Sequence, residues 1–339
     1  MITATEERVR VEREIVQRSS TVDVSIAIVT WNSADWIERC LSSIAAACEG
    51  IGFEVLVHDN ASVDATVALL EKNPNNRVKF HAATRNVGFA AGMNCAIRKA
   101  KGRYVLSLNP DCEPGPRSIA TLVGYLDEHP EVAAGAPLLL DEEGQPQREF
   151  QLRRFPTLWS IASELLLLDK ILPANGAAAR YRYRDLDITR PQRIEQPAAA
   201  ALLLRADVVR AVGEFDERFT PAWFEDVDYC RRMWEGGHVI HLVPQAVVVH
   251  RGGASLEHVP FATFAAVWYR NLFTYVSKWF PAGEAEAVRW LVIGGMMLRA
   301  AAAAVGRPKL PTDRRTAFHA YVDVMKKAFA RWDDPSRSF

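Results

Sequence analysis

Asp111 is a candidate functional carboxylate because of its position in the sequence. It comes directly after the apolar run of residues 104–108 and the pair Asn109-Pro110. An apolar run of this length, bounded by Gly102 and Pro110, predicts a buried parallel strand. Ligands of open α/β sheets bind beyond the carboxyl ends of such strands. A carboxylate there suits a hard divalent cation that must be held against a diphosphate. Since Asn, Pro and Asp also form turns, a plain turn is the alternative interpretation.

Three further polar groups occur where predicted strands end or a helix begins, namely Asp59-Asn60, Glu225-Asp226 and His250. Each has a structural alternative. Asp59 could cap a helix, the two acids could match a helix dipole, and His250 could be a core histidine. One polar group at the end of a strand is weak evidence for a functional site. Several such groups along one chain indicate a single site assembled from separate segments.

The elements that position these residues follow from hydrophobic periodicity. Strands are predicted at residues 24–30, 53–58, 78–81 and 104–108, with helices ending near residues 48, 72 and 99 between them. Residues 33–38 predict a capping box at the first of these helices. This alternation with short connections predicts an α/β fold with a mostly parallel central sheet and helices on both faces.

The rest of the chain is less regular. Strands are predicted at residues 138–140, 200–204, 238–241 and 246–250, with helices at 205–212 and 225–236. From Phe261 onward the pattern indicates long amphipathic helices rich in aromatic residues, and residues 6–17 predict one more helix at the N-terminus.

Composition excludes several classes of protein. The chain has 339 residues, 49% of them hydrophobic, and no net charge, which argues against disorder and against nucleic acid as a partner. Five cysteines without a CxxC pair indicate neither a disulfide framework nor a zinc site, so a reducing compartment is expected. No secretory signal or long uninterrupted apolar run is evident, which predicts a cytoplasmic protein.

The motifs taken together resemble the inverting glycosyltransferases of family 2, which have the GT-A fold, and most closely the bacterial dTDP-rhamnosyltransferases. The resemblance covers residues 24–255. It rests on Val29-Thr30-Trp31-Asn32, Asp59-Asn60-Ala61-Ser62-Val63-Asp64, residues 86–94, Asn109-Pro110-Asp111, residues 213–217, Phe224-Glu225-Asp226-Val227-Asp228 and residues 250–255.

The resemblance implies a GT-A nucleotide-diphospho-sugar transferase fold with C-terminal amphipathic helices added. It divides the chain into an N-terminal helical extension (1–22), a nucleotide-sugar-binding α/β half (23–135), an acceptor-binding and catalytic half (136–258) and a C-terminal helical region (259–339). It also implies a divalent cation, Mg²⁺ or Mn²⁺, held by Asp111 and His250. Many relatives have an aspartate where this chain has Asn109, so one charge is missing beside the cation.

Asp226 is the expected catalytic base, which accepts the proton of the acceptor hydroxyl. The substrate-binding residues implied by the resemblance are Thr30, Asn32, Asp59, Asn60, Arg85, Asn86, Gly88, Asn94, Asn109, Trp223 and Glu225. On one helix, Asp226 and Asp228 point about 200° apart, so we expect Asp228 to pair with Arg231 or Arg232 instead.

The expected reaction is transfer of L-rhamnose from dTDP-L-rhamnose to a glycan or polyprenyl-linked glycan during cell-surface polysaccharide synthesis. Residues 196–201 depart from the family pattern beside the substrates, so a UDP-sugar donor stays open. Asn109 keeps a catalytically silent sugar-nucleotide-binding protein open as well. A dinucleotide dehydrogenase is disfavoured because no G-x-G-x-x-G follows the first strand.

The C-terminal end is distinctly basic. Between residues 289 and 331 it has nine Lys or Arg residues against Asp313 and Asp323. Basic helices with interleaved aromatic residues suit peripheral contact with anionic lipid at the inner face of the plasma membrane. A solvated helical cap or a homodimer interface is the alternative.

Overall fold

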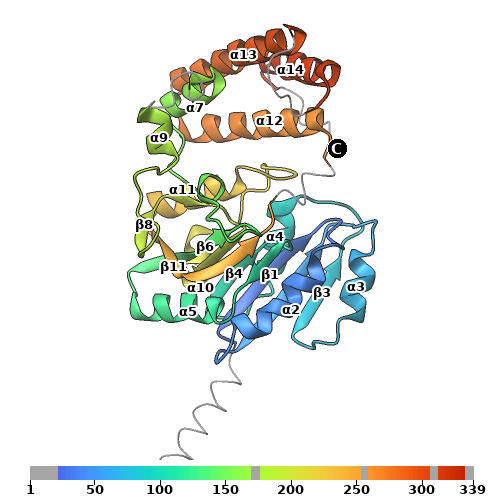
Figure 1. Ribbon diagram of the computed structural model, residues 1–339, viewed down its shortest axis with the longest axis vertical. Coiled ribbons are helices and arrows are strands. Elements are labelled where there is room, and N and C mark those ends of the chain that lie inside the picture. The colour runs from blue at the N-terminus through green and yellow to red at the C-terminus, as the bar shows by residue number, and fades with distance from the viewer. Residues whose placement is uncertain (1–21, 169–175, 253–258, 306–311, 333–339) are drawn as a thin grey trace, which may run out of the picture.

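The structure is a computed structural model that describes residues 22–168, 176–252, 259–305 and 312–332. The helix expected at residues 6–17 lies outside this part, as do residues 253–255 of the last motif. The described chain forms an α/β body built on a nine-stranded sheet, with a layer of C-terminal helices at one end (Figure 1).

The sheet is mixed, with its N-terminal part all parallel. Its order is β3 (Val78–Ala82), β2 (Phe53–Asp59), β1 (Val24–Thr30), β4 (Tyr104–Leu108), β10 (Ala201–Arg205), β6 (Val132–Leu140), β11 (Val239–His250) and β5 (Cys112–Pro114), and β8 (Gln192–Ile194) pairs with β11. Strands β3, β2, β1 and β4 run parallel, as do β6 and β11. Strand β10 is antiparallel to both β4 and β6, which sequence periodicity does not reveal.

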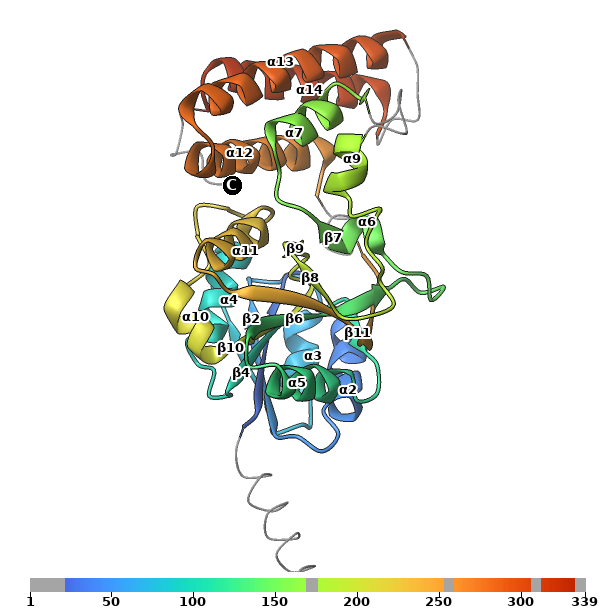
Figure 2. The ribbon, with the colours of Figure 1, turned by 90° about the vertical axis from the view of Figure 1, so that its left-hand side faces the viewer.

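Helices cover both faces of the sheet, as the sequence predicts, and the two views of the ribbon agree on this (Figure 2). On one face pack α2 (Ile37–Ala47), α3 (Thr66–Lys72) and α5 (Ser118–Glu128). On the other pack α4 (Phe89–Ile97), α10 (Ala206–Val212) and α11 (Glu225–Glu235). Each face of the sheet has its own hydrophobic core, because successive side chains of a strand point to opposite faces. In β1, Ile26 and Ile28 lie in the core on one face, and Ala27 and Val29 lie in the core on the other.

A third core joins the C-terminal helices to the α/β body. It lies among α7 (Leu158–Leu165), α12 (Phe261–Trp279), α13 (Ala282–Val305) and α14 (Arg314–Phe329), and it includes Phe219, Phe224 and Val227 from the α11 region. The short elements α6 (Arg148–Gln151), β7 (Leu152–Arg153), α9 (Gly176–Tyr181) and β9 (Gln196–Pro197) connect these layers. The C-terminal helices therefore share a core with the segment that carries the predicted catalytic base.

Two local predictions are wrong. The N-cap of α2 is Trp36 and has no side-chain cap, because Ser33 Oγ accepts from the Trp31 N–H instead. The two strands expected at residues 238–241 and 246–250 are one strand, β11, with an irregularity between Val243 and Val247. At a bulge the strand bends but stays paired in the sheet. The alternation of apolar residues is broken at that point, so the sequence suggests two strands.

Gly88 lies where the chain passes close to the loop before α11. Its φ is +87° and ψ is 166°, and a Cβ atom there would lie 2.9 Å from Thr220 Oγ1 and 3.0 Å from the Pro221 carbonyl oxygen. This backbone conformation is open essentially to glycine alone. Gly88 thus lets α4 begin directly against the loop that leads to α11.

We expect Gly88→Ala to lower the free energy of unfolding by about 1–3 kcal/mol, through backbone strain and the contacts with residues 220 and 221. The matched control is Gly124→Ala in α5, where a Cβ meets nothing within 4 Å. Because alanine favours helix, this control should be neutral or stabilise by up to about 1 kcal/mol. Equilibrium urea unfolding of both variants measures the difference, and a Gly88→Ala protein as stable as the wild type would contradict it.

Candidate active site

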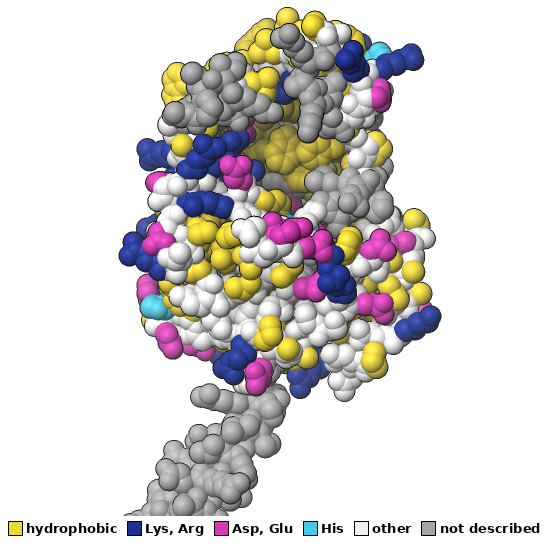
Figure 3. Space-filling model, in the orientation of Figure 1, with side chains coloured by type: hydrophobic (Ala, Val, Ile, Leu, Met, Phe, Trp, Pro, Cys, Tyr) yellow, Lys and Arg dark blue, Asp and Glu magenta, His cyan; other side chains and the backbone are white. Residues whose placement is uncertain are grey.

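Six of the residues predicted for the site line one cavity between the sheet edge and α12. The cavity has a volume of ≈ 370 Å³, within the range usual for small-molecule sites. Below the C-terminal helices the molecule is hollowed, and apolar side chains border the hollow (Figure 3). The six residues are Asn109, Asp111, Trp223, Glu225, Asp226 and His250.

Strand pairing brings Asp111 and His250 together although they are far apart in sequence. Strand β5 starts directly after Asp111 and runs antiparallel to β11, with Cys112 opposite His250. The Arg251 N–H donates to the Asp111 carbonyl at 3.2 Å. The distance from His250 Nε2 to Asp111 Oδ2 is 3.7 Å, and both side chains are buried. The two predicted metal ligands therefore face each other in the cavity wall.

Gln147 orients His250 through two contacts. Its Oε1 lies 2.7 Å from His250 Nδ1, and its Nε2 donates to the His250 carbonyl at 2.6 Å. Since the amide oxygen can only accept, the proton of a neutral imidazole sits on Nδ1. Nε2 then presents its lone pair toward Asp111, which is the arrangement of a metal-binding histidine.

The donor atoms of Asp111 and His250 fit a divalent cation. Asp111 Oδ1 is buried without a hydrogen-bond partner, which is unusual for a carboxylate. Burial raises the pKa of Asp111, although His250 and Arg251 oppose this, and burial lowers the pKa of His250. A neutral imidazole beside a carboxylate that lacks a partner is a suitable pair of ligands for Mg²⁺ or Mn²⁺.

Cys112 lies beside this pair but does not suit the cation. Its Sγ belongs to a group of ligand atoms, with those of Asp111 and His250, that lie within 4.8 Å of one another. However, the thiol donates to the Ala200 carbonyl at 3.3 Å, and burial raises its pKa. A protonated thiol is a poor ligand for a hard cation.

Asp226 enters the cavity from the first turn of α11. Its Oδ2 accepts from the Ala199 N–H at 3.3 Å and its Oδ1 from the Val227 N–H at 2.8 Å. Burial raises the pKa of Asp226, and these two N–H groups reduce the rise. Burial, followed by the charge of Asp226, also raises the pKa of Glu225, and Glu225 Oε2 has no partner. Both carboxyl groups therefore lie in surroundings that disfavour their charged forms.

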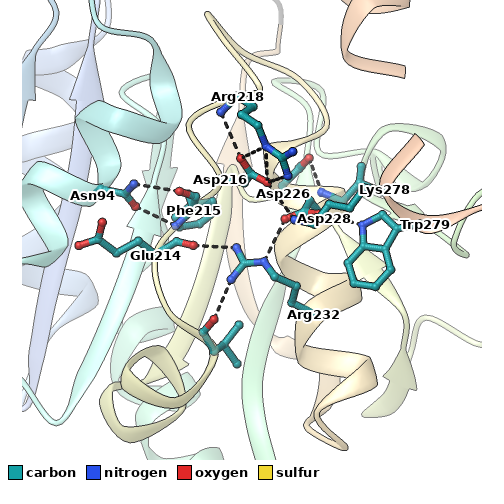
Figure 4. A network of polar contacts seen from close by, with 12 residues as sticks. Asn94, Glu214, Phe215, Asp216, Arg218, Asp226, Asp228, Arg232, Lys278 and Trp279 are labelled. Carbon is teal, nitrogen blue, oxygen red and sulfur yellow. Dashed lines mark hydrogen bonds and ion pairs between the residues drawn. The ribbon is translucent and has the colours of Figure 1, made fainter. Parts of the chain in front are cut away.

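Asp228 does not line the cavity with Asp226 but lies in a network with basic side chains (Figure 4). It is fully buried, and its Oδ2 accepts from Arg232 Nε at 3.0 Å. Its Oδ1 accepts from Lys278 Nζ at 2.7 Å and from Trp279 Nε1 at 2.8 Å. The expected pairing of Asp228 with a basic residue of its own helix is thus confirmed at Arg232, whereas Arg231 pairs with Glu235 at 2.6 Å.

Helix α12 also holds the loop that precedes α11. The buried Asn271 side chain donates to the carbonyls of Ala222 at 2.8 Å and Trp223 at 3.0 Å. Trp223 and Phe224 have φ values of 76° and 72°, a strained region for bulky residues. Phe264 and Trp268 of α12 line the cavity. The C-terminal helical region therefore builds part of the site.

The residues expected around the base form hydrogen bonds with one another and do not line this cavity. Asp59 is fully buried, with Oδ1 accepting from Thr30 Oγ1 at 2.7 Å and from Ser62 Oγ at 2.5 Å. Asn32 Oδ1 accepts from the Val63 N–H at 2.9 Å. These contacts hold the loops after β1 and β2 against each other, and recognition of a base by them stays a prediction.

The remaining predicted residues hold the loop before α4. Asn60 Oδ1 accepts from the Val87 N–H at 3.2 Å and its Nδ2 donates to the Gly88 carbonyl at 3.1 Å. Asn86 Oδ1 accepts from the Gly88 N–H at 2.8 Å. Asn94 is buried and exchanges hydrogen bonds with the backbone of Phe215, which ties α4 to the segment before α11. Arg85 is exposed on the same loop.

Sequence reasoning missed three residues of the cavity region. Gln147 gives no sequence signal, because its partner His250 is brought to it only by the fold. Arg153 and Gln196 line the cavity, and Arg153 Nε and Gln196 Oε1 are buried without partners. For Gln196 the departure from the family pattern at residues 196–201 was the available signal.

The chain is similar to known glycosyltransferases. The family model described as glycosyl transferase family 2 matches residues 25–187. The N-acetylglucosaminyl-diphospho-decaprenol L-rhamnosyltransferase of Mycobacterium tuberculosis is 27% identical over 290 residues, which is 81% of this chain and 90% of that protein. The rhamnosyltransferase WbbL of Escherichia coli is 26% identical over 267 residues, which is 75% of this chain and 93% of that protein.

Among solved structures, GalNAc-T7 with UDP, GalNAc and Mn²⁺ matches with a TM-score of 0.54 at 15% sequence identity. The match covers 94% of this chain and 58% of that one. At this identity the likeness concerns the fold alone.

We expect the protein to bind Mn²⁺ and Asp111→Asn to abolish this binding in isothermal titration calorimetry without substrates. Gln147→Leu should weaken it by about 10–100-fold, because it releases the imidazole of His250 from one orientation. Cys112→Ala is the control and should leave the affinity unchanged. Equal affinity in Asp111→Asn and the wild type would contradict this assignment of the ligands.

The network around Asp228 makes a prediction about stability. Asp228→Asn removes the buried counter-charge of Arg232 and leaves Lys278 with Asp216 as its one remaining carboxylate partner, at 2.9 Å. It should lower the free energy of unfolding by about 3–5 kcal/mol. Arg190→Gln removes an exposed ion pair with Asp187 and should change it by less than about 0.5 kcal/mol. Urea unfolding followed by circular dichroism measures both, and two equal effects would refute a structural role for the network.

Proposed function

Because the chain belongs to glycosyltransferase family 2 and has the GT-A fold, we propose that it transfers L-rhamnose from dTDP-L-rhamnose with inversion. The acceptor in this proposal is a glycan on a polyprenyl diphosphate, in cell-surface polysaccharide synthesis. The single observation that carries the proposal is that Asp111, His250 and Asp226 line one cavity. That the protein is a glycosyltransferase follows from the family itself; donor, acceptor and stereochemistry are the proposal.

The relatives support this choice of substrates. Both rhamnosyltransferases named above match over most of their own lengths, so the similarity extends beyond the nucleotide-binding half. The name of the mycobacterial relative specifies an acceptor sugar on a decaprenyl diphosphate. Rhamnose transfer to a lipid-linked glycan is therefore the most economical assignment for this chain.

Inversion needs one in-line displacement. The acceptor hydroxyl oxygen forms a bond to the anomeric carbon while the bond from that carbon to the nucleotide diphosphate breaks, and the hydroxyl proton passes to the Asp226 carboxylate. Asp111 and His250 would hold the divalent cation, which when bound supplies positive charge beside the departing diphosphate. Glu225 lines the same cavity with Oε2 unpartnered, so it can form a hydrogen bond with a sugar hydroxyl.

The nucleotide lies, in this proposal, against the loops after β1, β2 and β3. Thr30, Asn32, Asp59, Asn60, Arg85, Asn86, Gly88 and Asn94 hold or border these loops. Asn109 and Trp223 form the cavity wall next to them. Whether the base is thymine or uracil depends on contacts in this region, so a UDP-sugar donor is the first alternative.

The second alternative is a silent sugar-nucleotide-binding protein, which Asn109 favours because a ligand charge is missing there. Assays with dTDP-L-rhamnose and a panel of UDP-sugars separate the three cases. We expect turnover with dTDP-L-rhamnose only. Turnover with a UDP-sugar alone overturns the donor, and binding of nucleotide without any transfer, hydrolysis or effect of Asp226→Asn supports the silent protein.

Asp226→Asn should lower kcat by about 10²–10⁴-fold with little change in the KM for the donor, because it removes the base but keeps the shape. Glu128→Gln on the exposed side of α5 is the control and should be neutral. An unchanged kcat in Asp226→Asn would contradict the role of the base.

The raised pKa of Asp226 also predicts how the activity depends on pH. Only the carboxylate form can accept the proton, so activity falls as the pH falls through this pKa. The acid limb of kcat should therefore lie above the ordinary aspartate value of about 3.9. A pH profile measured at saturating substrate checks this, and an acid limb at or below that value would contradict it.

A further inference from the structure

The outward side of α13 is apolar from Trp290 to Val305. Arg299 is the one charged residue in this stretch, and its guanidinium turns inward to donate to the carbonyls of Leu165 and Glu164. The large side chains that remain exposed are Trp290 (52%), Met297 (57%), Leu298 (50%) and Val305 (78%). At 100° per residue they fall within an arc of about 100°, so they form one stripe.

Helix α14 adds a stripe that is both aromatic and basic. Five of its exposed residues fall within a similar arc of about 100°, namely Arg315, Phe318, His319, Lys326 and Phe329, whereas the exposed residues Arg314, Thr316 and Asp323 lie outside it. The rings of Phe329 and Trp290 meet edge to face with centroids 5.8 Å apart, which joins the stripes of α14 and α13. We call these two stripes together the outer face.

The charge on the outer face is positive. The acids at its border, Glu286 and Asp323, are paired, Glu286 with Arg289 and Asp323 with Lys327 at 2.7 Å. Exposed Arg315 and Lys326 therefore stand beside aromatic residues without an acid in the stripe. Aromatic and basic side chains on one helical surface are suited to the interface of an anionic bilayer.

Helix α13 does not suit a spanning segment, although among the described residues it is long and apolar enough to cross a membrane. Its other side is buried in the third core, with Val288, Val292 and Met296 fully covered. Withdrawing α13 into the hydrocarbon would expose that core and carry Arg299 into lipid. Contact along its length, parallel to the surface, keeps every one of these interactions.

We propose that the outer face lies on anionic lipid, with α13 and α14 parallel to the bilayer plane. The proposal deepens the function proposed above and rests on it for its purpose, because it brings the cavity beside α12 close to a lipid-linked acceptor. The anionic inner face of the plasma membrane is the membrane that fits. A second copy of the chain fits less well, since two such faces would oppose Arg315 and Lys326 without acids to pair them.

The test is sedimentation of the full-length protein with vesicles of phosphatidylcholine alone or mixed with phosphatidylglycerol. We expect the protein to sediment with the anionic vesicles, with binding that weakens as salt increases. Met297→Gln/Leu298→Gln should reduce binding through lost burial of apolar groups. Arg315→Glu/Lys326→Glu should reduce it by at least roughly 30-fold, since each basic residue near the surface contributes about fivefold.

The matched controls are Phe80→Gln and Lys72→Glu, which change an exposed apolar and an exposed basic residue of the α/β body and should leave binding unchanged. Binding that is absent in the wild type, or unchanged in both double variants, overturns the proposal. So does a dimer in analytical ultracentrifugation that the same variants dissociate, since a second copy then covers the face.

Activity on a detergent-soluble, short-chain acceptor separates this proposal from the function itself. Both double variants should keep wild-type kcat there, because neither changes the cavity. If no form of the enzyme transfers sugar while vesicle binding behaves as expected, the proposed function fails and the membrane surface stands. If transfer is normal and vesicle binding is absent, the membrane surface fails alone.

Discussion

Burial of the Asp228 carboxylate between Arg232 and Lys278 is the interaction that sets the geometry of the site. A buried charge without partners is too costly to keep, so satisfying it requires α12 to lie across α11. Trp279 completes the contact with a hydrogen bond. Once α11 is fixed in this way, Asp226 on its other side must point into the cavity. The polar network thus makes the C-terminal helices part of the candidate active site.

Unlike the Asp228 carboxylate, several buried polar atoms of the cavity have no hydrogen-bond partner. Asp111 Oδ1, Glu225 Oε2 and Gln196 Oε1 are such atoms. Native proteins rarely leave buried acceptors unsatisfied except where a ligand completes them. The same burial raises the pKa of Asp111, Glu225 and Asp226. A cation and a sugar diphosphate would supply the missing charge and hydrogen-bond partners, in agreement with the proposed binding site.

Much of the fold and part of the site could be predicted from the sequence. Apolar periodicity located β1 and β4, and the helix geometry of residues 226 and 228 separated their roles. Strand direction could not be read, because Ala201–Arg205 is buried on both faces whether it runs parallel or antiparallel. Gln147 and Lys278 were missed for a related reason: their partners are distant in sequence. Asp59 was placed correctly at a strand end, but its hydrogen bonds to Thr30 and Ser62 depend on tertiary contacts.

The central claim is that one cavity holds the cation, the leaving diphosphate and the base. A crystal structure of the protein with Mn²⁺ and dTDP tests it most directly. We expect an anomalous manganese peak at bonding distance from both Asp111 Oδ1 and His250 Nε2, with the diphosphate on the ion and Asp226 facing it across the cavity. A nucleotide bound elsewhere, or a manganese ion that contacts neither residue, would show that this cavity is not the site.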